Sequence, residues 1–215
     1  MLRPTLAVAA LLAATLLPGA AAAHPHVWVT TRAAVLYDGD GRVRAIRHAW
    51  TFDEGYSAFA VQGLEGADGA LRPDKLAELA KINMESLGEQ GFFTVAKING
   101  AKQGFGPPAD AAVTVEGGRM TLDFTLPLKT SSKADRTFSL EVYDPTFFVE
   151  FALADGPEAV KLDGAPKGCA LNVRRPKPEK AAESKGLSEQ LFAALGSATS
   201  NVGAQFSASV LVACP

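Results

Sequence analysis

Two runs of alternating side chains, separated by an Asp-Gly-Asp-Gly turn, constrain the fold most strongly. Residues 26–37 and 42–53 alternate and are rich in β-branched and aromatic residues, as is typical of strands. The turn over 38–41 carries the Asp-Gly signal of a β-hairpin. We therefore predict that the two runs pair as an antiparallel hairpin.

The rest of the chain adds further strands and a few helices. Apolar residues recur at helical spacing over 73–87, and 55–63 and 188–195 also favour short helices. The strand–helix–strand alternation of a parallel sheet does not occur. The sequence predicts an α+β fold that is predominantly antiparallel β and sandwich-like, with about three short helices.

The first 23 residues have the organisation of a cleavable signal peptide. Arg3 gives a positive start, an apolar core follows over 6–17, and an alanine run supplies small residues at the cleavage point. Cleavage at the end of this segment leaves His24 as the new N-terminus. Cleavage after Ala22 is also compatible with the alanine run.

The mature chain is expected to be a single periplasmic domain over 24–215. No later apolar run approaches the length of a membrane span. The formal net charge of the whole chain is −2, and the lack of a long basic run argues against a nucleic-acid partner. The charged, proline-rich stretch near 174–186 is predicted to be a mobile loop.

The chain has two cysteines, Cys169 and Cys214. In an oxidising compartment, a single pair of cysteines most simply forms a disulfide. We expect a bridge with Cα atoms about 4.4 to 6.8 Å apart. Closing a loop of this length contributes roughly 4 kcal/mol in the chain-entropy model.

All three histidines lie in the first quarter of the sequence, and two are separated by a single residue. In a strand, His24 and His26 would share a face and could converge on one metal ion. If His24 is the new N-terminus, its amine adds a third nitrogen. This set resembles a histidine brace, which suits Cu(II) and also Zn(II) or Ni(II).

Asp53 is the predicted third side-chain ligand or supporting partner. With a two- or four-residue turn, the numbers of paired residues sum to about 79. His26 then faces Asp53, and Trp28 faces Thr51. Glu54 takes the place of Asp53 if the register slips by one.

Two further candidates remain open. By the same count, His48 faces Thr31 and points to the opposite side of the sheet, so it ranks below the carboxylate as a ligand. Asp144 could contribute from a distant strand, although Asp-Pro is typical of a turn.

Six short motifs spread over the mature chain carry a family resemblance: His-Pro-His-Val-Trp-Val at 24–29, Arg-His-Ala-Trp-Thr-Phe-Asp-Glu at 47–54, Phe-Ala-Val-Gln-Gly-Leu at 59–64, Gly-Phe-Phe at 91–93, Glu-Val-Tyr-Asp-Pro at 141–145 and Gly-Ala-Gln-Phe at 203–206. Together they resemble the domain-of-unknown-function family 1007, often labelled the periplasmic component of an ABC-type transport system. The resemblance implies an exported protein encoded near nickel, cobalt or zinc permeases. It also implies a histidine at the His48 position, which counts in favour of that residue as a ligand.

These observations favour a periplasmic accessory protein that binds a transition metal and is not an enzyme. The expected ligands are His24, His26 and Asp53, the ion is Zn, Cu or Ni, and the expected partner is an inner-membrane metal permease or ABC-type transporter. One alternative is a copper enzyme of histidine-brace type. Another is a structural interaction module that binds no metal.

Overall fold

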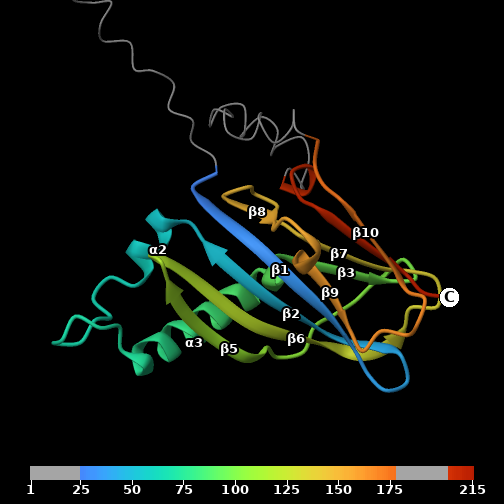
Figure 1. Cartoon of the computed structure of the whole chain (residues 1–215), viewed down its shortest axis with the longest axis horizontal. Coiled ribbons are helices and arrows are strands. Elements are labelled where there is room, and N and C mark those ends of the chain that lie inside the picture. Colours follow the sequence, from blue (N-terminus) through green and yellow to red (C-terminus); the bar gives the residue numbers. More distant parts are fainter. Residues whose placement is uncertain (1–24, 178–202) are drawn as a thin grey trace, which may run out of the picture.

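The computed structural model describes residues 25–177 and 203–215. The predicted signal peptide, His24 and the predicted helix over 188–195 lie outside the described residues. The predicted loop over 174–186 is described only as far as Lys177. In the described part, strands predominate over helices, and the fold is α+β and β-rich (Figure 1).

The described elements are eleven strands, two α-helices and three short 3₁₀ helices: β1 (Val27–Tyr37), β2 (Arg42–Phe52), α2 (Glu54–Ala60), α3 (Pro73–Glu89), η2 (Gly91–Phe93), β3 (Thr94–Ile98), β4 (Ala101–Lys102), β5 (Ala109–Glu116), β6 (Arg119–Lys133), β7 (Phe138–Val142), β8 (Val149–Leu153), η3 (Pro157–Ala159), β9 (Val160–Asp163), β10 (Ala170–Arg174), η4 (Gly203–Gln205) and β11 (Ser209–Ala213). A six-stranded sheet has the order β5-β6-β2-β1-β8, with β9 also paired to β1. A five-stranded sheet has the order β10-β11-β7-β3-β4.

The predicted hairpin is confirmed, but its register differs from the prediction by two residues. Val29 pairs with Phe52 and Thr30 with Thr51, so the paired numbers sum to 81 rather than 79. The turn closes through a hydrogen bond from the Asp38 N–H to the Arg42 carbonyl, at 2.9 Å. It therefore contains three residues instead of two or four.

An irregularity in the hairpin accounts for the rest of the shift. Tyr37 pairs with Val43, whereas the preceding Leu36 pairs with Ala45, so one residue of β2 is unpaired. A β-bulge of this kind adds one residue to one strand only. Because the total shift is two, each side chain keeps its predicted face of the sheet.

β1 has parallel neighbours as well as its antiparallel hairpin partner. Besides its antiparallel partner β2, it pairs in parallel with β8 and then with β9. The chain leaves β7 in the smaller sheet, crosses to the larger one and runs alongside β1 in the same direction. The larger sheet is therefore mixed, although most of its pairings remain antiparallel.

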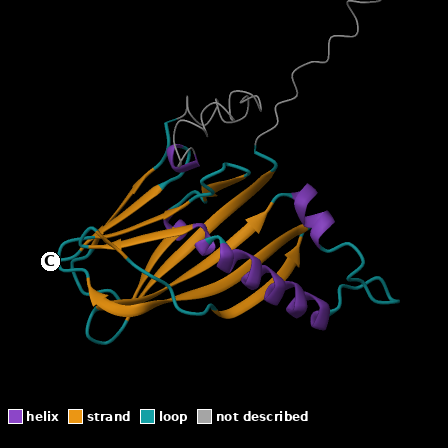
Figure 2. Ribbon diagram, turned by 180° about the vertical axis from the view of Figure 1, so that it is seen from behind, coloured by secondary structure: helices purple, strands orange, loops and turns teal. Residues whose placement is uncertain are grey.

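Only part of the inner face of the larger sheet packs against the smaller sheet. There the core contains side chains such as Val35 and Ile46 from one sheet, and Leu140 and Val212 from the other. The remaining part packs against α3, which crosses the sheet diagonally (Figure 2). The sandwich-like layering is thus limited to one portion of the fold, and a helix completes the other.

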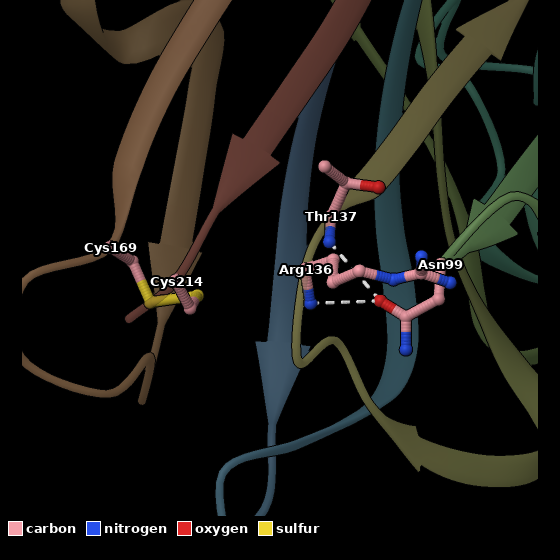
Figure 3. The surroundings of a disulfide bond; sticks show 5 residues. All are labelled: Asn99, Arg136, Thr137, Cys169 and Cys214. Atoms are coloured by element: carbon pink, nitrogen blue, oxygen red, sulfur yellow. Dashed lines mark hydrogen bonds between the residues drawn. A yellow bond between two sulfur atoms is a disulfide. The ribbon is translucent and has the colours of Figure 1, made fainter.

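The predicted disulfide is present between Cys169 and Cys214 (Figure 3). The Cα atoms are 4.1 Å apart, slightly closer than the expected range. The bond joins the ends of β10 and β11, which pair with each other in the smaller sheet. Within the described residues, no helix has the length and apolar character needed to cross a membrane.

Candidate metal centre

His26 lies directly before β1 and is fixed through its backbone. Its N–H donates to the carbonyl of Phe148 at 2.9 Å, just where β8 begins to run beside β1. The imidazole is exposed, and its ring centroid lies 4.7 Å from that of the Phe148 ring. The buried Val27 and exposed Trp28 continue the alternation, so His26 is on the outer side of the sheet.

Asp53 lies across from Trp28 instead of His26, which corrects the predicted pairing. The Trp28 N–H donates to Asp53 Oδ2 at 3.0 Å, and the Asp53 N–H donates to the Trp28 carbonyl at 2.9 Å. The two-residue change of register causes this offset. Asp53 therefore lies opposite Trp28, which is about 7 Å along the strand from His26.

The Asp53 side chain also begins α2. Its Oδ1 accepts a hydrogen bond from the Tyr56 N–H at 2.9 Å, which makes Asp53 the N-cap of the helix. An aspartate directly before a helix is a common sequence signal for a cap, and the ligand hypothesis did not use it. Each carboxylate oxygen accepts one of these bonds and retains capacity for another partner.

His48 is a packed core residue on the opposite side of the sheet. It pairs with Ala33 on β1, not with Thr31 as predicted, and is fully buried. Its ring stacks on Phe124 with centroids 4.9 Å apart. Burial lowers the pKa of His48 from its ordinary value of 6.5 to about 3, so the imidazole stays neutral.

Asp144 forms a turn, as its Asp-Pro sequence indicates. Its Oδ1 accepts from both the backbone N–H and the hydroxyl of Thr146, each at 2.8 Å. Its Oδ2 accepts from the Val149 N–H at 3.1 Å. The buried carboxylate thus organises the loop that leads into β8.

The C-terminal segment packs on the same loop. The rings of Phe147 and Phe206 have centroids 4.5 Å apart. Gly203 approaches the Asp144 carbonyl so closely that a Cβ atom would collide with it, which explains the glycine. Three distant parts of the sequence therefore meet beside the start of β1 (Figure 1).

The described residues contain no ready-made group of three metal-ligating side chains from His, Cys, Asp and Glu. Of the three predicted ligands, the structure places His26 and Asp53 at the same end of the β1–β2 hairpin, with Asp53 opposite Trp28, two residues along the strand from His26. His24 lies outside the described residues. The geometry provides one exposed imidazole on a fixed backbone and one oriented carboxylate nearby.

Comparisons with known proteins give a family and a distant relative. The family described as "Protein of unknown function (DUF1007)" matches residues 9–214. An uncharacterised protein of Haemophilus influenzae is 23% identical over 194 residues, which cover 89% of this chain and 91% of the relative.

Proposed function

The chain belongs to the DUF1007 family, and from this premise we propose that it is an exported periplasmic accessory protein that binds a transition metal ion. It would pass the ion to or from an inner-membrane permease or ABC-type transporter. The observation that carries the proposal is the exposed imidazole of His26, a residue whose backbone N–H is bonded to the Phe148 carbonyl at the start of β1.

His24 completes the proposed donor set from two positions upstream. Removal of the signal peptide would expose its amine, so that the amine and the two imidazoles could bind one ion. The proposal needs this segment to fold back toward His26. Asp53 would add a carboxylate oxygen or accept a hydrogen bond from a ligating imidazole.

The disulfide supports the proposed location. Disulfides persist in oxidising compartments such as the periplasm and are rare in the cytosol. The Cys169–Cys214 bond is therefore the pairing expected of an exported chain.

The test is calorimetric titration of the mature protein with Zn(II), Cu(II) and Ni(II). His26→Ala should remove most of the binding. Asp53→Asn, which keeps a capping side chain but removes the charge, should weaken affinity by roughly 10- to 100-fold if Asp53 supports a ligand. Affinity should also decrease at lower pH, because protons compete for the imidazole lone pairs.

Two controls make the titration decisive. His48→Phe removes a histidine from the core without changing the proposed centre, and should leave affinity unchanged. A chain that retains one extra residue before His24 tests the contribution of the terminal amine. Unchanged affinity in His26→Ala would refute the proposed centre, and a collapse in His48→Phe would move the site to the interior.

A further inference from the structure

A charged pocket lies on the outer face of the larger sheet, where β9 runs beside β1 (Figure 1). Its volume is about 600 Å³, which falls within the range of small-molecule sites. The short side chains of Ala34 and Ala49 leave room above the strands. Six charged residues, three of each sign, also line the pocket: Arg32, Arg47, Lys161, Asp123, Glu158 and Asp163.

Four of these six charges are already paired with each other. Arg47 Nη1 lies 3.5 Å from Asp163 Oδ2, and Lys161 forms an ion pair with Glu158. Within the described part of the chain, neither Arg32 nor Asp123 has a hydrogen-bond or ion-pair partner for its side chain. The pocket therefore presents one guanidinium and one carboxylate that a ligand can use.

Arg32 and Asp123 stand on either side of Ala49. Ala49 on β2 pairs with Arg32 on β1 and with Asp123 on β6, so the three residues form a row across the sheet. Because neighbouring strands are about 4.8 Å apart, the Cα atoms of the two charged residues are about 10 Å apart. The pKa of Glu158 is lowered mainly by its hydrogen bond with Lys161 and to a smaller extent by the charge of Arg32. The Arg32 charge therefore acts on the side of the pocket away from Asp123.

Asp123 is half-buried and lacks a compensating cation. Burial raises the pKa of its carboxyl group, because the charged form loses water. Its neighbours on the two adjacent strands are Ala49 and Ala112, whose side chains cannot donate a hydrogen bond. An ammonium group in the pocket would supply charge-assisted hydrogen bonds to this carboxylate. Arg32 is suited to the opposite charge, since a guanidinium can bind both oxygens of a carboxylate.

We propose that this pocket binds a small zwitterion, with its carboxylate on Arg32 and its ammonium group on Asp123. The gap above Ala49 favours a ligand that carries the two charges at opposite ends, as a short peptide does. The equal numbers of positive and negative residues in the lining match a ligand without net charge. The site goes beyond the proposed metal function, because it uses none of the proposed metal ligands.

The probe is glycylglycine, which has an ammonium group at one end and a carboxylate at the other. Titration into isotopically labelled protein, followed by NMR, should give saturable shifts of the backbone amide signals of Arg32, Ala49 and Asp123. A chelator keeps metal out of the experiment, so a failure here leaves the proposed metal centre untouched. Glycylglycinamide lacks the carboxylate and N-acetylglycylglycine lacks the ammonium group, and each should bind at least about tenfold more weakly.

Two substitutions assign each ligand charge to its residue. Arg32→Gln should weaken the binding of glycylglycine about tenfold and leave that of glycylglycinamide unchanged, because the amide has no carboxylate. Asp123→Asn should weaken the binding of glycylglycine and leave that of N-acetylglycylglycine unchanged. The matched controls are Arg44→Gln and Asp40→Asn, which make the same charge changes at exposed positions outside the lining. Both controls should leave all three affinities unchanged.

Thermal melting checks that each variant keeps its fold, and the three probes test the wild-type protein without any substitution. Absence of saturable shifts would overturn the proposal. Equal affinity for the three probes would also overturn it, as would equal losses in the lining variants and the controls.

Discussion

Acidification should destabilise the fold through one buried side chain, His48. Its Nε2 lies 3.5 Å from the Thr94 hydroxyl, which itself donates to the Phe92 carbonyl at 2.7 Å. The hydroxyl oxygen can therefore accept a hydrogen bond from Nε2, which favours the tautomer with its proton on that atom. The other nitrogen, Nδ1, is buried and finds no partner in the described part of the chain. Protonation there would bury both a charge and an unsatisfied donor.

The size of the effect follows from the difference in pKa between the folded and unfolded chains. Burial lowers the pKa of His48 from 6.5 to about 3, so the unfolded chain takes up the proton first as the pH falls. The contribution to stability is complete above pH 6.5 and decreases toward pH 3. At about 1.4 kcal/mol per pH unit, the loss is about 2 kcal/mol at pH 5 and about 4 kcal/mol at pH 3, where half of the folded molecules are protonated.

Urea unfolding at pH 7.5 and pH 5, with a chelator present, measures this loss. The His48→Phe variant is the matched control, because it keeps a ring against Phe124 and removes the titrating group. Other acids titrate in both proteins, so only the difference between them reports on His48. The wild-type protein should lose about 2 kcal/mol more than the variant. Equal losses would refute the reasoning and show that the folded state accommodates the imidazolium.

Two further predictions concern stability. Asp53→Ala removes the N-cap of α2 and the hydrogen bond from the Trp28 N–H. It should lower the free energy of unfolding, measured by urea titration, by about 1 to 2 kcal/mol. An equally large loss in Asp53→Asn would show that the charge, and not the cap, is responsible. Reduction of Cys169–Cys214 should lower the stability by up to roughly 4 kcal/mol, with the double serine variant as the control that a reductant must not affect further.

The hairpin was predictable because its signals are local. Alternation over 26–37 and 42–53 placed both strands to within one residue of their observed ends, and the Asp-Gly turn joined them correctly. The register was not predictable in the same way. A three-residue turn and a bulge each move it by one residue, and both depend on backbone conformations that the alternation pattern does not specify.

The candidate site shows the same division between local and distant information. The placement of His48 on the face opposite His26 follows from strand parity, and the two-residue shift preserves it. The capping role of Asp53 was also a local signal, but the ligand hypothesis competed with it. The parallel pairing of β8 with β1 joins distant segments, so no local pattern indicates that Phe148 holds His26.

The position of β1 has a consequence for the order in which the chain folds. Its antiparallel partner β2 follows at once, so the hairpin can close while little of the chain has emerged. Its parallel partners are far downstream, since Val27 pairs with Val149 and Leu36 with Asp163. Loop closure over such separations is slow, and the larger sheet remains incomplete until these residues are present. If the chain crosses a membrane N-terminus first, the larger sheet would stay incomplete for most of the passage. The strands β8 and β9 would be added to β1 last.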